Sequence, residues 1–481
     1  MSQRIAAQFV SGGVSEPARS LTVRGEYDVI VAGGGLAGVS AAVASARAGA
    51  RTLLLERNGF PGGVATAGMC CSVFNCYYTA GHELVVKGNS LEFVDRLAQA
   101  HGPGSHWHRH KGHIIYDVET AKMVLTDLVE EAGGDVLFEA PVVGAVMDDS
   151  RLRGVVIETN SGREALLAET VVDCTGNSDV AWHSGAPVRE TGGGIHGLES
   201  LVFRVGGVDV DRFVEYFVAH PEEYPPYMDV DWTFEEALAQ YKDTGTFLFP
   251  HGGGELFSII RDGIASGIYP TQVGVHDHID ALQIHAIRDL GVAHLITGFS
   301  RIEKLDVGRI TRAMIDGRKM AFEVTEFFRG HVPGFEKSYV SATGDDLGIR
   351  VSRWIDGEFK FAPEMKANAT RFEDSIGRGV VESDFVKNTA PGAWGVQAME
   401  DSTFDIPYRC MLPREVDGLI MGAGRSVSAV NPWTLRVMAL TMVIGQGAGV
   451  AAAVCADSGT VPREVDITEV QSILRHQGAE V

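Results

Sequence analysis

The most regular pattern of apolar positions lies between Tyr27 and Glu56. The apolar, partly β-branched run from Asp28 to Val31 predicts a strand, and the segment from Leu36 to about Ala48, rich in alanine and small residues, predicts a helix. A second apolar run, from Arg51 to Leu55, predicts a strand that ends at Glu56. The pattern therefore predicts a strand–helix–strand (βαβ) unit.

The turn before the predicted helix carries Gly33, Gly35 and Gly38 with the spacing G-x-G-x-x-G. Missing side chains at these positions allow a tight bend, close approach of backbone N–H groups to a pyrophosphate, and close packing of helix on strand. The helix N-terminus carries the positive end of its dipole and favours phosphate there. Glu56 follows about twenty residues later, where a carboxylate can accept both ribose hydroxyls. We predict a dinucleotide site, with a non-binding βαβ unit as the alternative, and the acid disfavours NADP.

The same glycine spacing recurs at Gly192, Gly194 and Gly197. No apolar strand precedes this second copy, so it is interpreted as a loop.

Further along the chain, Leu91 to Ala100 and Asp117 to Gly133 have helical spacing. Three short β-like runs then predict a small sheet, inserted before the main sheet resumes at Glu169 to Asp173: Asp135–Phe138, Val142–Met147 and Gly154–Thr159. Between Ala186 and Thr403 the segments are longer and more polar, and no further βαβ fingerprint occurs. We interpret that part as a substrate domain.

The composition narrows the classes of function. The chain of 481 residues is 45% hydrophobic and 22% charged, which is typical of a soluble protein with more than one domain. A formal charge of −22 argues against nucleic acid and anionic membrane as partners. We expect a small organic molecule as the partner, and the sequence also allows a homo-oligomer.

The six cysteines form neither a disulfide framework nor a zinc-site spacing, so a cytoplasmic location is expected. The first 25 residues lack the features of a signal peptide and are expected to be a poorly ordered lead-in. Val437 to Ala456 is long enough to span a bilayer, but Gln446 and three glycines interrupt it. A helix buried against a cofactor is the preferred interpretation.

Five histidines lie in the stretch HGPGSHWHRHKGH, at positions 101, 106, 108, 110 and 113. They can bind a metal, but no carboxylate or cysteine lies nearby in sequence. We predict no metal site and instead a polar loop at a pocket mouth, with one histidine contacting the substrate.

Three stretches together resemble a known family. Glu56 is followed by Gly62, Gly63 and a small hydroxylic run; the strand at VVDCTGNSD ends in Thr175 and Gly176; and the closing block FDIPYRCMLPREVDGLIMGAGRSVSA leads into RVMALTMVIGQGAGVAAA. These motifs resemble those of FAD-dependent oxidoreductases with a glutathione-reductase-type flavin domain. The resemblance runs from Tyr27 to nearly the end of the chain.

The resemblance implies an α/β fold: a Rossmann-type flavin domain with an inserted α+β substrate domain. The flavin domain is then discontinuous, comprising 26–185 and 404–481, with the lead-in at 1–25 and the substrate domain at 186–403. The cofactor implied is FAD. The closing unit would bring backbone N–H groups and a helix N-terminus to the flavin N1–C2=O edge.

By the same resemblance, the expected FAD-binding residues are Gly33, Gly35, Gly38, Glu56, Arg57, Gly63, Val143, Thr175, Gly176, Gly424, Arg425, Gly445 and Gln446. The candidate catalytic residues are His110, Arg350, Asn431 and Arg436. Arg350 and Arg353, in GIRVSRWIDGEFKF, are each a candidate to anchor a carboxylate or to stabilise reduced flavin, with a structural arginine as the alternative.

Two departures from the family pattern bear on mechanism. Many relatives have a histidine-bearing stretch where this chain has Asn431, Pro432 and Trp433, and aromatic hydroxylases have Gly-Asp where this chain has Gly-Arg, at Gly424 and Arg425. We therefore predict an oxidase or dehydrogenase that transfers hydride from a small organic substrate to flavin N5. A flavin monooxygenase and a flavoprotein electron-transfer subunit are the alternatives. Substrate, electron acceptor, base and covalent attachment of the flavin stay open.

Overall fold

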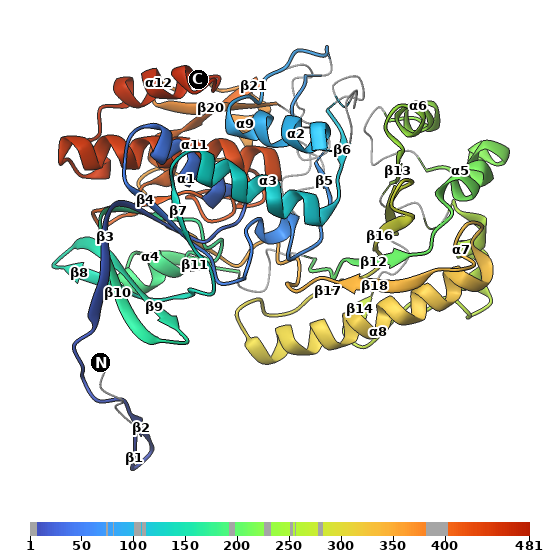
Figure 1. Ribbon diagram of the computed structural model, residues 1–481, viewed down its shortest axis with the longest axis horizontal. Helices are drawn as coiled ribbons and strands as arrows, with labels where there is room; N and C mark the ends of the chain where they lie inside the picture. Colours follow the sequence, from blue (N-terminus) through green and yellow to red (C-terminus); the bar gives the residue numbers. More distant parts are fainter. Residues whose placement is uncertain are drawn as a thin grey trace.

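The computed structural model describes residues 7–73, 76–79, 81–100, 107, 112–191, 198–225, 232–250, 254, 256–277, 282–380 and 403–481. A seven-stranded sheet lies on one side of the molecule and a five-stranded sheet on the other (Figure 1). The predicted combination of an α/β unit with an inserted α+β unit is confirmed, while the predicted domain boundaries stay predictions.

The seven-stranded sheet is built around the predicted βαβ unit. In spatial order its strands are β7 (Asp135–Leu137), β4 (Thr52–Leu55), β3 (Thr22–Ala32), β10 (Gly162–Asp173), β9 (Arg151–Thr159) and β8 (Val142–Asp148), and β22 (Leu419–Met421) also pairs with β10. The strands β7, β4, β3, β10 and β22 are parallel, whereas β8 and β9 form an antiparallel hairpin.

The prediction that residues 135–159 form a separate small sheet is wrong. The strand β7 pairs in parallel with β4, and the β8–β9 hairpin joins the same sheet through β10. The reason is the length of β10, which has 12 residues: its first half pairs with β9, and its last three residues pair with β22.

The N-terminal part also differs from the expected lead-in. Residues 22–25 already belong to β3 and pair with β10. Before them, β1 (Gln8–Val10) and β2 (Gly13–Ser15) form a small exposed hairpin that stands away from the sheets (Figure 1).

Helices α1 (Leu36–Arg47) and α11 (Met438–Ser458) pack side by side, although they come from opposite ends of the chain (Figure 1). A Cβ atom at Gly445 would lie 2.2 Å from the carbonyl oxygen of Ala37, and one at Gly449 would lie 2.1 Å from that of Ala41. Larger residues would hold the two helices apart, so the glycines allow the close contact.

Within the described residues, α11 is one helix that is long and apolar enough to cross a membrane. Of its most apolar window, 89% is buried inside the protein. Its apolar composition is accounted for by this burial in the core, against α1.

The five-stranded sheet is antiparallel throughout. Its strands, in spatial order, are β13 (Thr246–Phe249), β15 (Gln283–Ile287), β16 (Val292–Ile296), β12 (Phe203–Gly206) and β18 (Tyr339–Thr343). The long helix α8 (Val307–His331) begins at Asp306, whose side chain accepts a hydrogen bond from the Arg309 amide, and it packs on β12 and β18. The residues of α8 in the main buried apolar cluster, which also contains residues of this sheet, are Met320, Ala321, Val324, Phe327 and Phe328.

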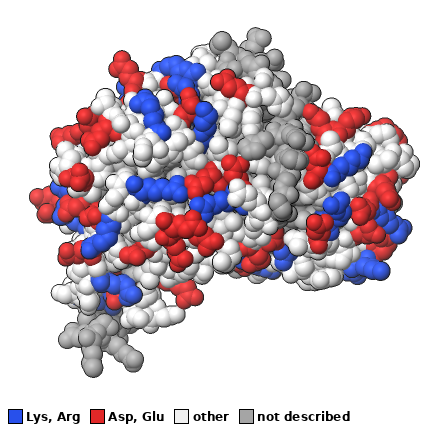
Figure 2. Space-filling view, turned by 45° about the horizontal axis from the view of Figure 1, so that its top comes forward, with Lys and Arg blue, Asp and Glu red and all other residues white. Residues whose placement is uncertain are grey.

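The remaining elements complete the layers. The other α-helices are α2 (Asn89–Ala100), α3 (Val118–Glu131), α4 (Asp179–Ser184), α5 (Val210–Ala219), α6 (Phe234–Thr244), α7 (Ser258–Ala265), α9 (Pro363–Ala367) and α12 (Ile467–His476). The short strands form pairs β5 (Ser72–Val73) with β6 (Ile114–Ile115), β11 (Val188–Glu190) with β19 (Arg353–Ile355), β14 (His276–Asp277) with β17 (Phe299–Ser300), and β20 (Ser375–Val380) with β21 (Thr403–Pro407). On the face shown in Figure 2, acidic and basic side chains are interspersed.

Candidate functional site

Four of the predicted cofactor segments follow parallel strands of the seven-stranded sheet. Gly33 to Gly35 follow β3, Glu56 follows β4, Thr175 and Gly176 follow β10, and Gly424 and Arg425 follow β22. Because these strands are parallel, all four segments lie at the same carboxyl edge of the sheet, where ligands bind in open α/β sheets.

The glycines of the first turn have different neighbours. Gly33 has a φ of +99°, and a Cβ atom there would lie 2.6 Å from the carbonyl oxygen of Cys174. A Cβ atom on Gly38 would lie 1.8 Å from the carbonyl oxygen of Gly33, so both glycines serve close packing. At Gly35, which begins α1, no described atom lies within 4 Å of the Cβ position. The backbone of Gly35 is therefore open to a ligand.

The Glu56 carboxylate is fixed at the end of β4. It accepts hydrogen bonds from the Gly34 amide at 2.7 Å and the Asn58 amide at 2.8 Å, and the residue is 5% exposed. Burial raises the pKa of Glu56, and the two N–H donors oppose this rise. Each carboxylate oxygen retains acceptor capacity for a ribose hydroxyl. The neighbouring Arg57 instead forms an ion pair with Asp346 at 2.6 Å.

The loop after Glu56 lies against the first glycine turn. The Gly62 amide donates to the carbonyl oxygen of Gly34 at 2.7 Å, and a Cβ atom on Gly63 would lie 3.2 Å from the Gly35 Cα. Gly62 and Gly63 have φ angles of +114° and +54°, which favour glycine. The loop that the resemblance assigns to the cofactor thus touches the open backbone at Gly35.

The Thr-Gly segment after β10 is held by an acid that the sequence interpretation missed. Asp173 is fully buried and accepts hydrogen bonds from the Thr175 amide at 3.0 Å, the Thr175 hydroxyl at 2.7 Å and the Ala181 amide at 3.1 Å. Burial raises the pKa of Asp173 to about 6. An acid directly before Cys-Thr-Gly, at the end of an apolar strand, is the signal that could have identified it.

Arg425 links the turn after β22 to two other segments. Its guanidinium donates to the carbonyl oxygen of Ile349 and, at 3.3 Å, to Asn177 Oδ1, and burial lowers its pKa to about 10. A Cβ atom on Gly176 would lie 2.5 Å from this guanidinium. Gly424 is needed because a Cβ atom there would lie 2.0 Å from the carbonyl oxygen of Leu435.

The positions of the three other predicted cofactor residues are as follows. Gly445 faces α1, as described above, and the buried Gln446 accepts a hydrogen bond from the Asn89 amide at 3.0 Å. Val143 lies in β8 where the register with β9 shifts between Val142 and Gly144. Their roles toward FAD stay predictions.

Two of the candidate catalytic residues meet at Trp433. The guanidinium carbon of Arg350 lies 6.0 Å from the centroid of the Trp433 ring, and that of Arg436 lies 4.3 Å from it. Arg350 also lies 5.0 Å from the Phe299 ring. Both arginines and Trp433 are partly exposed, so this cluster is accessible.

Asn431 shapes the turn that carries Trp433. Its side-chain oxygen accepts a hydrogen bond from the Trp433 amide at 3.1 Å, and its carbonyl oxygen accepts one from the Thr434 hydroxyl at 2.9 Å. His110 lies outside the described residues, so its predicted role is untouched by the structure. Arg353 is ion-paired with Asp179 at 2.8 Å and lies over Trp182, as a structural arginine would.

Cys70 connects this cluster to the glycine loop. Its amide donates to the carbonyl oxygen of Val64 at 3.0 Å, and its carbonyl oxygen accepts from the Tyr116 hydroxyl at 2.8 Å. Burial raises the pKa of the Cys70 thiol, and the charges of Arg350 and Arg436 oppose this rise. The preceding residue, Met69, belongs to one apolar cluster with Phe299. Of the described residues that follow Cys70, Cys71, Val73, Cys76 and Tyr77 belong to the core.

A buried ion pair lies next to the cluster and was not predicted. Glu199 Oε1 lies 3.3 Å from Lys304 Nζ, with side chains 0% and 5% exposed. Burial raises the pKa of Glu199 to about 7, and the charges of Lys304 and Arg350 oppose this rise. The partners are far apart in sequence, so no local pattern could have identified the pair.

The structure does not support a role for His113 at a pocket mouth. This histidine is 2% exposed, and its Nδ1 lies 2.9 Å from Gln240 Oε1. His101, His106 and His108 lie outside the described residues. Within the described part, His220, Glu222 and Glu223 are close enough to share a metal ion, but His220 and Glu222 are exposed and Glu223 accepts a hydrogen bond from Tyr216.

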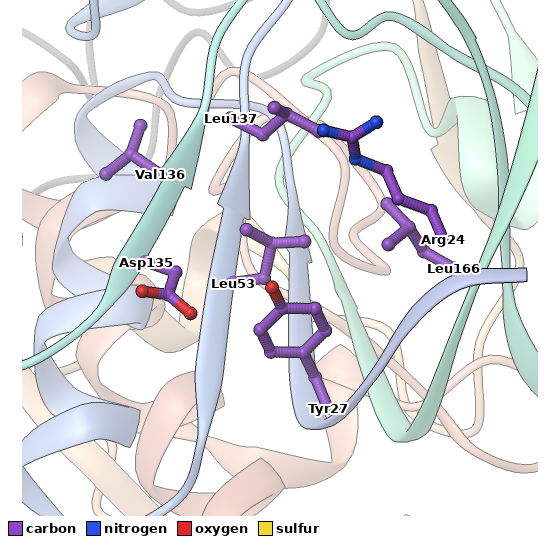
Figure 3. Close-up of a pocket in the computed structure, with 7 residues that line it drawn as sticks. All are labelled: Arg24, Tyr27, Leu53, Asp135, Val136, Leu137 and Leu166. Carbon is purple, nitrogen blue, oxygen red and sulfur yellow. The ribbon is translucent and has the colours of Figure 1, made fainter.

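A hollow of about 490 Å³ lies away from these groups. Figure 3 shows Tyr27, Leu53, Asp135 and Arg24 among the residues that line it. These residues precede the carboxyl ends of β3, β4 and β7, whereas the glycine turns follow them. The hollow is therefore not the cofactor site.

Known proteins resemble the chain over different lengths. A thiamine thiazole synthase from Aeropyrum pernix is 32% identical over 167 residues, which are 32% of this chain and 56% of that protein. The matched part thus spans about half the length of this relative.

Two solved structures cover more of the chain at low identity. A geranylgeranyl bacteriochlorophyll reductase-like protein from Thermoplasma acidophilum shares 14% identity, covering 94% of this chain and 83% of that one, with a TM-score of 0.43. A p-nitrophenol 4-monooxygenase from Pseudomonas putida shares 15%, covering 95% and 81%, with a TM-score of 0.39. The model of the FAD dependent oxidoreductase family matches residues 28–474, and the protein therefore belongs to this family of FAD-dependent enzymes.

Proposed function

We propose that this enzyme oxidises a small organic molecule, as an oxidase or a dehydrogenase. FAD, when bound, supplies a hydride acceptor at N5. The observation that carries the proposal is the meeting of Arg350 and Arg436 at Trp433.

The residues at the carboxyl edge fit FAD. The open Cβ position of Gly35 leaves its backbone approachable for a pyrophosphate, and the Glu56 carboxylate is already oriented by two backbone N–H groups. Glu56 would accept the ribose hydroxyls, and the amides of the first turn would face phosphate oxygens. The family supplies the identity of the cofactor, and these two features support where it binds.

The substrate would bind where three parts of the chain come together. Phe299 and Arg350 come from the region of the antiparallel sheet, Trp433 and Arg436 from the closing block, and Cys70 from the loop after β4. In this position the aromatic rings would contact the carbon skeleton, and the arginines would fix its orientation. The group that receives the substrate proton is not assigned.

The test is anaerobic mixing of the FAD-loaded protein with a panel of alcohols, amines and acids, followed by admission of air. Bleaching of the flavin absorbance with rapid recovery in air supports an oxidase, and slow recovery supports a dehydrogenase. A Trp433→Leu variant should then raise KM for the active panel member without changing the FAD content.

Other outcomes would contradict the proposal. If only NAD(P)H bleaches the flavin, and if the consumption of NAD(P)H depends on an aromatic substrate, the result would instead support a monooxygenase. Co-purification of a second polypeptide that accepts the electrons would support an electron-transfer subunit. Acid precipitation in the same preparation shows whether the flavin is covalently attached, because free flavin leaves its colour in the supernatant.

A further inference from the structure

Helix α8 has an exposed side as well as the buried side that packs on the five-stranded sheet. The helix lies at the edge of the molecule, with strands of that sheet on one side of it (Figure 1). Three large apolar residues of α8 nevertheless face solvent: Val307 is 77% exposed, Ile315 44% and Phe322 64%. Ile315 and Phe322 are seven residues apart, which is almost two turns, so they lie on the same side of the helix.

The exposed apolar residues cannot be covered by the chain's own core. Met320 and Val324, on the opposite side of α8, are already buried in it. Rotation of the helix would therefore expose these residues in order to bury Ile315 and Phe322. Single exposed apolar residues are common, but several on one side of a helix are typical of a surface that binds another molecule. We look for its partner in the charges beside it.

These charges change sign along the helix. The exposed charged residues of α8 after its first turn are, in chain order, Arg312, Lys319, Glu323, Glu326 and Arg329. Arg312 pairs with the buried Asp316, and Arg329 pairs with Glu326 at 2.7 Å. Lys319 also lies 3.8 Å from Asp316, which Arg312 holds more closely. Two cations against one anion leave the first half of this side positive, and two anions against one cation leave the second half negative.

A second copy of α8 complements this surface when it runs in the opposite direction. A twofold axis beside Phe322 places the two Phe322 rings against each other, with about 8–10 Å between the helix axes. The same axis places Lys319 of each copy opposite Glu323 of the other. A parallel pair would instead place each of these charges opposite its own equivalent, and like charges repel. The order of the charges therefore favours the antiparallel pair.

We propose that the protein forms a twofold-symmetric dimer in which α8 of each copy packs antiparallel on α8 of the other. Ile315 and Phe322 supply buried apolar contacts, and the charges select the direction. A second copy is the partner because the surface is complementary to itself in this arrangement. The inference goes beyond the proposed function, since no residue assigned to the cofactor or the substrate lies in α8.

The first experiment measures the mass of the FAD-loaded protein by analytical ultracentrifugation over a wide range of concentration. One helix from each copy is a small interface, so the mass should pass from one chain to two as the concentration rises. Phe322→Ala should raise the dissociation constant of the dimer roughly ten-fold or more. Met123→Ala is the matched control, because Met123 is 61% exposed on α3, and it should leave that constant unchanged. Both variants should retain their FAD.

Charge exchange tests the direction of the pair. Lys319→Glu and Glu323→Lys should each weaken the dimer, because each sets like charges opposite one another. The double variant Lys319→Glu/Glu323→Lys restores opposite charges and should regain at least part of the affinity. In a parallel pair each residue faces its own equivalent, so the double variant would regain nothing. Glu130→Lys, at an exposed position of α3, is the control for a change of net charge.

The inference is overturned if the protein stays a single chain at every concentration, if Phe322→Ala forms the dimer as before, or if the double variant is no tighter than the single ones. A different polypeptide that co-purifies and is lost in Phe322→Ala would also overturn it, since the surface would then belong to that partner. Should Phe322→Ala lose its FAD, the charge variants decide alone. Reduction of the flavin by the substrate panel is a separate measurement, so failure of the proposed function leaves these outcomes distinct.

Discussion

The Gly34 amide donates a hydrogen bond to Glu56 Oε2 at 2.7 Å, which joins the glycine turn after β3 to the end of β4. The acid is thus oriented before any ribose arrives. Because little ordering of this side chain remains for the cofactor to impose, the arrangement favours tight binding of FAD.

Glu56→Gln should weaken FAD binding. A glutamine presents one oxygen and one NH₂ group, so either the Gly34 or the Asn58 amide would face a donor. The NH₂ group also cannot accept a hydrogen bond from a ribose hydroxyl, and loss of that bond to FAD costs about 1–3 kcal/mol, or roughly ten-fold or more in Kd. Titration of apoprotein with FAD checks this, and the exposed Glu130→Gln in α3 is the control. Equal affinities for both variants would contradict the assignment.

Gly35→Ala should lower the affinity for FAD, whereas Gly33→Ala should lower the stability of the protein. The Gly35 position has space for a methyl group, so the apoprotein should melt at an unchanged temperature while FAD affinity falls at least ten-fold. Gly33 has a φ of +99° and a Cβ position 2.6 Å from a carbonyl oxygen, so alanine should cost about 1–3 kcal/mol of stability or more. Thermal unfolding and FAD titration of both variants check this. A Gly35→Ala protein with normal FAD affinity would place the pyrophosphate elsewhere.

Gly445→Ala should destabilise the protein whether or not FAD binds. Its methyl group would lie 2.2 Å from the Ala37 carbonyl oxygen, and overpacking of this kind costs about 1–3 kcal/mol. Gly330→Ala in α8 is the matched control, because no described atom lies within 4 Å of its Cβ position. That control should stabilise by about 0.5–1 kcal/mol. Denaturant unfolding of apo and FAD-loaded forms tests both, and a loss seen only in the loaded form would instead favour the predicted cofactor contact.

Asp173 should make stability depend on pH. Burial raises its pKa from 3.8 to about 6, so between these values the native state binds more protons than the unfolded state. Stability contributed by this group is then present at low pH and lost as pH rises through about 6, with a total on the order of 3 kcal/mol. Unfolding curves measured between pH 4.5 and 6.5 give the free energy of unfolding as a function of pH. Asp173→Asn should flatten the slope of this dependence, while Asp457→Asn, at an exposed position, should leave the slope unchanged. An unaltered slope in Asp173→Asn would show that another group causes it.

Local patterns predicted the elements at the cofactor edge, because the strand before Gly33 and the helix after Gly35 each follow from neighbouring residues. The helix at 118–131 was predicted for the same reason, and its start at Asp117 is confirmed by the side-chain cap on the Thr120 amide. Partners of strands were harder to predict. A short run such as 135–137 shows its β character but not that it pairs with β4.

The features of the site that the sequence did not predict depend on contacts between distant parts of the chain. Glu199 and Lys304 meet only through the fold, and Arg350 could not be separated from Arg353 without the positions of Trp433 and Asp179. The close packing of Gly445 on α1 could not be predicted either, because its neighbour Ala37 lies at the other end of the chain, while the contact of Gly445 with the cofactor stays a prediction.

The contact between α1 and α11 also constrains how the chain folds during synthesis. The Ser40 hydroxyl donates to the carbonyl oxygen of Met442, so the first βαβ unit and its covering helix are separated by most of the polypeptide. At about 5–20 residues per second on the ribosome, α1 waits on the order of twenty seconds or more for its partner. During that interval the apolar face of α1 lacks the cover that α11 provides in the folded protein.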